Sequence, residues 1–204
     1  MTKEEIKNRI ATSNDRRTIE CLIDEIMAMP VPWLFINKFG NEAIQKYQVF
    51  RTYMASVFKM PATAFFICGS SMLGFSLSPH KSFADFNEDS DVDIAIISSK
   101  LFNEYWKRFF YDYTNSVLTG KVYTEIAKNV FKHFIDFHTT YAQTHPYYLQ
   151  WQKKTSDYAK DLQIKFDFPE EISYRIYSSY EDYRENLIKT IYDIKEKEIR
   201  GLGQ

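Results

Sequence analysis

Two short motifs combine residue types that could bind a phosphate and a metal ion. Gly69 and Ser70 directly follow the apolar run TAFFIC, and Asp91 and Asp93 flank a valine in SDVDI. Glycine permits a sharp turn at the end of a strand, and serines at the start of a helix leave N–H groups and hydroxyls that can bind an anion. Gly69, Ser70 and the following Ser71 therefore indicate a phosphate-binding turn.

The two aspartates indicate a metal site. Asp91 and Asp93 are two residues apart in a segment rich in β-branched residues. On a strand their side chains leave the same face, where two carboxylates repel each other unless a divalent cation neutralises them. Mg²⁺, or Mn²⁺ in its place, is the expected cofactor. A metal ion beside a phosphate is what phosphoryl transfer requires, because the ion offsets the charge that develops during attack.

The local sequence pattern predicts strands that would position both motifs. TAFFIC is a short apolar run and VDIAII is rich in β-branched residues, so both are expected to be strands of a covered sheet. SSMLGFSL, between them, is expected to form one or two helical turns. QIKFDF alternates polar and apolar residues, and it is predicted to form a β-hairpin with ISYRIY.

Helical patterns precede and follow these strands. Apolar residues at helical spacing predict two helices over residues 4–28, with a break near TSND, and a third over residues 42–58. Aromatic residues at helical spacing predict two or three helical segments over residues 101–162. A last helix is expected from Ser178, where Ser-Ser-Tyr-Glu has the pattern of a capping box.

Together these elements predict one α/β (α+β) unit over residues 1–204. Its expected parts are a helical preface (1–60), a core with the Gly-Ser and Asp-x-Asp motifs (61–100), a helical insert (101–162), and a β-hairpin with a C-terminal helix (163–204). A chain of 204 residues is long enough for one domain with a full core. The 45% hydrophobic content argues against disorder.

Charge and composition limit the partners. Lys and Arg total 26 and Asp and Glu 27, so no overall basic field attracts nucleic acid, and template-directed polymerisation is disfavoured. The charged N-terminal segment and the lack of an apolar run of ~20 residues predict no membrane insertion. Two widely separated cysteines fit a reducing, cytoplasmic setting.

The order of these features resembles the nucleotidyltransferases of the DNA polymerase β superfamily. The resemblance covers roughly residues 62–98: a strand, Gly-Ser, a short helix with Gly74, then Asp-Val-Asp on a second strand. It implies a small mixed sheet flanked by helices. It also implies that Gly69 and Ser70 bind the nucleotide phosphates, and that Asp91 and Asp93 are catalytic Mg²⁺ ligands.

Members of that superfamily place a third carboxylate on a later strand, where it helps to activate the acceptor hydroxyl. Asp167, on the polar face of the predicted QIKFDF strand, is the candidate for this catalytic and metal-binding role, and Asp136 is its rival. The segment between Gly69 and Asp91 is longer than in the tightest members. It is expected either to fold over the nucleotide, with Lys81 near the phosphates, or to be a solvated loop.

The resemblance implies the transfer of an NMP or dNMP from a nucleoside triphosphate, such as ATP, to a hydroxyl. The acceptor stays open among a nucleic-acid 3′ end, a protein hydroxyl, a second nucleotide and a small molecule such as an aminoglycoside. Small relatives occur in bacterial toxin–antitoxin and antiviral defence modules, which suggests a cognate partner protein. The alternative is a catalytically weak or inactive module on the same fold that senses a nucleotide or binds a partner.

Overall fold

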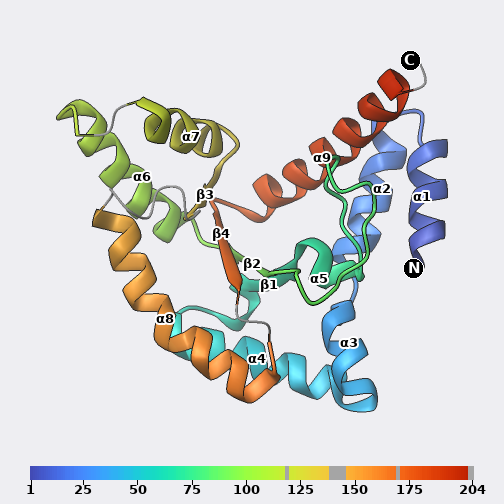
Figure 1. The fold of residues 1–204 in the computed structure, drawn as a ribbon, viewed down its shortest axis with the longest axis horizontal. Helices are drawn as coiled ribbons and strands as arrows, with labels where there is room; N and C mark the ends of the chain where they lie inside the picture. Colours follow the sequence, from blue (N-terminus) through green and yellow to red (C-terminus); the bar gives the residue numbers. More distant parts are fainter. Residues whose placement is uncertain (118–119, 138–145, 169–170, 202–204) are drawn as a thin grey trace.

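The structure is a computed structural model that describes residues 1–117, 120–137, 146–168 and 171–201 (Figure 1). The elements follow the chain as α1 (Lys3–Thr12), α2 (Arg16–Met27), α3 (Trp33–Phe39), η1 (Gly40–Glu42), α4 (Ala43–Phe58), η2 (Ala62–Ala64), β1 (Phe65–Cys68), α5 (Gly69–Leu73), β2 (Val92–Ile97), α6 (Ser99–Thr114), α7 (Gly120–Phe131), β3 (Phe134–Asp136), α8 (Pro146–Phe166), β4 (Ile172–Tyr177) and α9 (Tyr180–Gly201).

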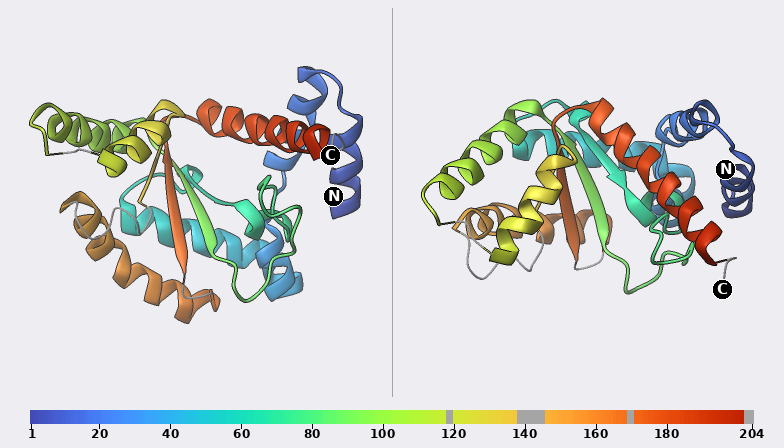
Figure 2. Two further views of the ribbon diagram at one scale, coloured as in Figure 1. Left: turned by 45° about the horizontal axis from the view of Figure 1, so that its top comes forward. Right: turned by 90° about the horizontal axis from the view of Figure 1, so that it is seen from above.

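The strands form one mixed sheet in the order β1-β2-β4-β3. β1 is antiparallel to β2, β2 is parallel to β4, and β3 is antiparallel to β4. Helices lie on both sides of this sheet, with α4 and α8 on one side and α9 on the other (Figure 2). The α+β class expected from the sequence is therefore confirmed.

The two faces of the sheet differ in chemistry. One face packs on α3, α4, α6 and α8 through a large apolar cluster. It is formed on the strands by Phe65, Ile67, Val92, Ile94, Ile96, Ile135, Tyr174 and Ile176. Because side chains alternate along a strand, the residues between these, including Asp93 and Arg175, belong to the opposite face. Burial of the apolar side chains on one face therefore determines that Asp93 and Arg175 lie on the opposite face of the sheet.

A second apolar cluster joins the two ends of the chain. It contains residues of α1, α2, α5 and α9, among them Ile6, Leu22, Ile23 and Ile191. The Lys195 ammonium on α9 also donates hydrogen bonds to the carbonyl oxygens of Ile10 and Ser13. The expected helical preface therefore packs partly on the C-terminal helix.

Most of the predicted elements are present. Helices over residues 3–27 and 43–58, strands at 65–68 and 92–97, and a C-terminal helix agree with the sequence prediction, as does the strand ISYRIY. The expected insert contains α6, α7 and most of α8, together with the short strand β3, which the sequence analysis did not predict. Leu118 and Thr119 lie outside the described residues.

The predicted hairpin of QIKFDF with ISYRIY is wrong. Gln163 to Phe166 form the last turn of α8, and the Asp167 N–H donates to the Gln163 carbonyl. Leu162 and Phe166 are buried, whereas Ile164 is 83% exposed, so the apolar side chains follow the helical and not the strand period. β4 pairs instead with β2 and β3.

Within the described residues, no helix is both long and apolar enough to cross a membrane.

Candidate active site

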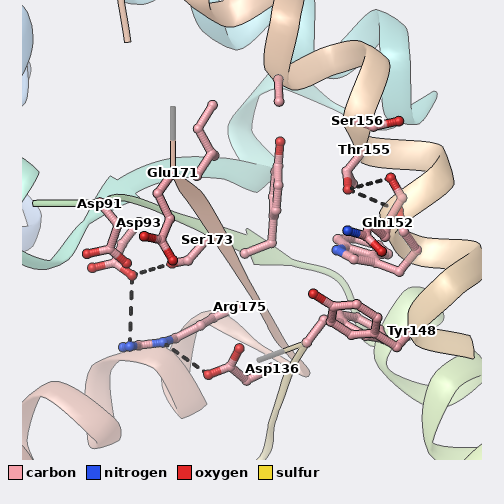
Figure 3. A pocket seen from close by; sticks show the side chains of 15 residues that line it. Asp91, Asp93, Asp136, Tyr148, Gln152, Thr155, Ser156, Glu171, Ser173 and Arg175 are labelled. Atoms are coloured by element: carbon pink, nitrogen blue, oxygen red, sulfur yellow. Dashed lines mark hydrogen bonds and ion pairs between the residues drawn. The ribbon is translucent and has the colours of Figure 1, made fainter. Parts of the chain in front are cut away.

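Asp91 and Asp93 stand at the start of β2, on the face opposite the large apolar cluster. Asp93 is 8% exposed and Asp91 is half-buried. The Ser173 hydroxyl, across the parallel β2–β4 pair, donates a hydrogen bond to Oδ1 of Asp93. Nη2 of Arg175 lies 3.8 Å from the same oxygen (Figure 3). The two aspartates therefore share a face, as their spacing predicted.

The surroundings of Asp93 disfavour an isolated negative charge. Burial raises the pKa of Asp93 above its ordinary value, although the Arg175 guanidinium acts in the opposite direction. The Asp91 carboxylate raises this pKa further, and the hydrogen bond from Ser173 lowers it. Because the net shift is upward, the pair would gain from a nearby divalent cation.

Gly69 forms a turn built directly against Asp93. Its φ is +63°, a left-handed conformation that glycine adopts without strain. A Cβ at position 69 would overlap the Asp93 carboxylate, with Cγ of Asp93 3.0 Å away. Both the backbone conformation and the space therefore favour glycine here. The Gly-Ser turn and the Asp-x-Asp strand, separate in the sequence, form one structure.

The predicted phosphate-binding residues differ in accessibility. Ser70 is partly exposed beside Gly69. Ser71 is 0% exposed, and its hydroxyl donates a hydrogen bond of 2.8 Å to the Cys68 carbonyl. The Ser71 hydroxyl thus closes the turn between β1 and α5, and phosphate binding by Ser71 stays a prediction. Lys81 is exposed in the loop between α5 and β2.

A cleft of about 450 Å³ brings these predicted residues together. Its lining includes Gly69, Ser70, Lys81, Asp91 and Asp93, and we call it the α5 cleft. The loop over residues 75–86 borders it and is held by its own hydrogen bonds, such as Ser76 N–H to the Ala84 carbonyl. Lys81 lines this cleft although its side chain is exposed, so both expectations for it stay open.

A second cleft, of about 350 Å³, meets the first at the two aspartates. It lies between β4 and α8, and we call it the α8 cleft. Asp91, Asp93 and Arg175 line both clefts. Tyr148, Gln152 and Thr155 of α8 form its opposite wall (Figure 3). The aspartate pair is therefore accessible from two sides.

Asp136 lies in the α8 cleft, on the same face as the aspartate pair. β3 pairs with β4 so that Asp136 is opposite Arg175, and Nε of Arg175 is 4.0 Å from Oδ2 of Asp136. Arg175 therefore lies between the carboxylates of Asp93 and Asp136 (Figure 3). Although burial by itself disfavours the charged guanidinium, Asp93 raises the pKa of Arg175. Arg175 is the positive charge that balances this site.

Asp167 lies away from the aspartate pair. It follows the end of α8 with a φ of +51°, its side chain is 96% exposed, and Oδ2 is 3.0 Å from the Lys38 ammonium. It lines neither of the two clefts. The sequence predicted that Asp167 lies on a strand beside VDIAII. In the structure the residues before it form the last turn of α8 instead.

Sequence reasoning missed Glu171. It immediately precedes β4, and because Val92 pairs with Ile172, Glu171 is level with Asp91. Both line the α8 cleft, and Figure 3 shows them on the same side of it. The signal was present in EISYRIY, whose alternation places Glu171, Ser173 and Arg175 on one face.

The residues present fit a magnesium ion that substrate helps to hold. Within the described residues, no group of three or more His, Cys, Asp or Glu side chains is arranged to hold a metal. Mg²⁺ is commonly bound by one or two carboxylates together with substrate phosphates and water. Asp91 and Asp93 supply such a pair, in the cleft that Gly69 and Ser70 also line.

Searches of protein-family models, of curated proteins and of solved structures find no match for this chain. The chemistry of the site is therefore the basis for assigning a function.

Proposed function

We propose that this chain is a metal-dependent nucleotidyltransferase that moves an NMP or dNMP from a nucleoside triphosphate to a hydroxyl. The observation that carries the proposal is the fit of Gly69 against Asp93, which leaves no room for a Cβ. This contact joins a glycine-serine turn to an aspartate pair in one cleft. Such an arrangement serves to hold a metal-bound phosphate.

The donor triphosphate would lie in the α5 cleft. The Gly69 backbone can approach phosphate oxygens closely, and the Ser70 hydroxyl and Lys81 ammonium line the same cleft and can donate hydrogen bonds to them. Asp91 and Asp93 would hold Mg²⁺ or Mn²⁺, which when bound neutralises charge on the phosphates. Arg175, which now balances Asp93, would then be available to a phosphate oxygen.

The acceptor hydroxyl would approach from the α8 cleft. Its oxygen forms a bond to the α-phosphorus, the bond from that phosphorus to the bridging oxygen breaks, and pyrophosphate leaves. Glu171 would take the hydroxyl proton, since it is exposed and level with Asp91 at the start of the adjacent strand. Asp136 is less suited to this step because Arg175 lies beside it.

The second candidate is a catalytically weak or inactive module that senses a nucleotide or binds a partner. The position of Arg175 favours it, because an arginine between Asp93 and Asp136 supplies the positive charge that a metal would otherwise bring. The fit of Gly69 against Asp93 would also serve nucleotide binding without turnover.

Incubation with each α-labelled NTP and dNTP in Mg²⁺ or Mn²⁺ separates the two candidates. Nucleotidyl transfer predicts labelled product and released pyrophosphate, both abolished in Asp91→Asn/Asp93→Asn. Asp89→Asn is the matched control, because Asp89 is exposed in the preceding loop and lines neither cleft. If nucleotide binds and no product forms with any acceptor class, the sensing module is the better description.

A further inference from the structure

We infer that a third pocket, separate from the α5 and α8 clefts, binds a small organic carboxylate, and that Arg51 recognises its charge. The pocket has a volume of about 180 Å³ and lies beside β1, a strand at one edge of the sheet. Its walls come from the end of α2 and the segment after it, and from α4, β1, α5 and α9. We call it the β1 pocket. The inference does not rest on the proposed function.

The charge of the β1 pocket is positive. Among the described residues that line it, only Arg51 carries a charge. Nε of Arg51 donates a hydrogen bond of 3.0 Å to the Ala62 carbonyl. The described residues offer its two terminal nitrogens no hydrogen-bond acceptor and its charge no carboxylate partner. Asp24, whose charge acts on Tyr180 of the lining, is itself bound by Arg184 through two hydrogen bonds. The pocket therefore has unused N–H donors and a charge that favours an anion.

Two aromatic rings help to hold the guanidinium in place. Cζ of Arg51 lies 5.8 Å from the ring centroid of Tyr47 and 5.7 Å from that of Phe66. Tyr47 precedes Arg51 by one turn of α4, and Phe66 is on β1. Packing on these rings and the bond to Ala62 account for the stem and for Nε of Arg51, but not for its terminal nitrogens. A guanidinium held in this way keeps a planar pair of donors ready for the two oxygens of a carboxylate.

The rest of the wall suits an apolar body about the size of one ring. Three methionines, Met27, Met29 and Met72, line the pocket, and their flexible side chains can adapt to a ligand. A cavity of roughly 150 Å³ accommodates benzene. The volume of about 180 Å³ therefore leaves room for a ring and one charged group, but not for a whole nucleotide. Pro30 and Tyr180, which also line the pocket, are exposed, so a ligand can enter from solvent.

The β1 pocket adjoins the α5 cleft. Met72 and Tyr183 line both of them, whereas Arg51 lines the β1 pocket and neither cleft. Tyr183 is 3% exposed and Met72 is 9% exposed, so little solvent reaches either side chain. A carboxylate bound at Arg51 would therefore contact residues of the α5 cleft without occupying the space beside Gly69 and Asp93.

Benzoate and benzamide provide the test, because they have nearly the same shape and differ in charge. Acetate, which has the charge without the ring, is the third probe. We expect benzoate to bind about tenfold more tightly than benzamide, because a hydrogen bond to a charged group contributes more than a neutral one. We expect a similar advantage over acetate, which leaves the apolar walls uncovered. NMR titration of protein labelled with ¹³C at the methionine methyl groups measures the three affinities.

The methyl signals also locate the ligand. The chain has six methionines, and benzoate should shift the signals of Met27, Met29 and Met72. Met54, which is 0% exposed within the large apolar cluster, should keep its signal unchanged. This measurement uses the wild-type protein, so it does not depend on how a substitution affects folding. No shift at the three lining methionines would overturn the inference.

Variants test the role of the guanidinium. Arg51→Gln should bring the affinities of benzoate and benzamide close together, and a melting curve checks that the variant is folded. Arg108→Gln is the matched control, because Arg108 also lies near two tyrosine rings, 5.9 Å from Tyr105 and 5.1 Å from Tyr147, outside the β1 pocket. Equal affinities in the wild type, or a preference for benzoate that survives in Arg51→Gln, would overturn the inference.

Nucleotide binding is measured separately from carboxylate binding. A non-hydrolysable triphosphate analogue with Mg²⁺ should bind Arg51→Gln as tightly as the wild type, because Arg51 lines neither cleft. A loss of nucleotide affinity in this variant would make the pocket part of the nucleotide site and overturn a separate carboxylate site. If the analogue binds neither protein while benzoate binds as expected, the proposed function fails and the carboxylate site is supported.

Discussion

Asp93 is the residue at which the interactions of the site meet. It accepts a hydrogen bond from Ser173, lies 3.8 Å from Arg175, and fills the space beside Gly69 that a Cβ would need. Replacing Gly69 therefore tests the backbone turn, and replacing Asp93 tests the buried charge.

Replacing Gly69 with alanine should both destabilise the protein and abolish nucleotide transfer. The left-handed backbone costs an alanine ~1–2 kcal/mol, and the new Cβ must also displace the Asp93 carboxylate. Gly120→Ala is a close control, since its φ is +62° and no atom of the described residues lies within 4 Å of its added Cβ. Chemical denaturation and label transfer measure both variants. Equal activity in the two would mean that the contact with Asp93 is unimportant.

Replacing Asp93 with asparagine should stabilise the metal-free protein at neutral pH. The pKa of Asp93 is raised in the folded state, so its stabilising contribution is fully present below the unfolded-state pKa of ~3.9 and is lost as pH rises through the folded-state pKa. Asparagine does not ionise, so the variant should melt above the wild type near neutral pH, and the difference should shrink toward about pH 4. Melting curves in a chelator measure this. A wild type that is more stable at neutral pH would contradict it.

At the scale of elements, β4 decides which charged and polar side chains lie near Asp91 and Asp93. It lies parallel to β2 and places Glu171 level with Asp91, Ser173 beside Asp93, and Arg175 opposite Asp136. α8 supplies the facing wall of the cleft, and its last turn leads the chain away toward Lys38. Asp167, which follows α8, and Glu171, which precedes β4, therefore lie in different surroundings.

Glu171→Gln should lower turnover while NTP binding is largely kept. A group that takes a proton in the transition state typically contributes a factor of roughly 10² to 10⁴ in rate. Asp167→Asn is the matched control and should keep wild-type turnover, because its carboxylate pairs with Lys38 outside both clefts. Single-turnover rates and nucleotide affinity are the measurements. Loss of turnover in the Asp167 variant alone would restore Asp167 as the third carboxylate.

At the scale of the whole molecule, two clefts approach one pair of aspartates from different sides. The α5 cleft is bordered by elements of both chain ends, since α5 and α9 share an apolar cluster with α1 and α2. The α8 cleft is bordered by the insert and β4. The proposed donor and acceptor would therefore approach Asp91 and Asp93 from different clefts.

Mg²⁺ together with an NTP should raise the melting temperature more than either alone. The triphosphate would supply oxygen ligands to the metal, and the metal would neutralise charge on the triphosphate. Each therefore strengthens binding of the other to the native state. A ligand at one hundred times its dissociation constant stabilises by about 2.7 kcal/mol. Asp91→Asn/Asp93→Asn should show no such joint effect in differential scanning fluorimetry. A joint shift that persists in this variant would locate the metal elsewhere.

The sequence by itself determined the parts of the site that depend on near neighbours. An apolar run followed by Gly69 and Ser70 specifies a strand and a turn. The β-branched run VDIAII specifies a second strand, and the two-residue spacing of Asp91 and Asp93 puts them on one face. Helical spacing likewise specified α2, α4 and α9. These features follow from backbone sterics and from the period of apolar residues, which can be read within ten or twenty positions.

The tertiary structure alone decided which further carboxylates lie near Asp91 and Asp93. QIKFDF alternates like a strand, yet the burial of Leu162 and Phe166 keeps it helical, because Phe166 packs on Phe35 and Phe50 from distant helices. The place of Glu171 beside Asp91 depends on the pairing of β4 with β2, two strands far apart in the chain. Such pairing is set by which apolar faces fit together in the folded core, and no local pattern contains that information.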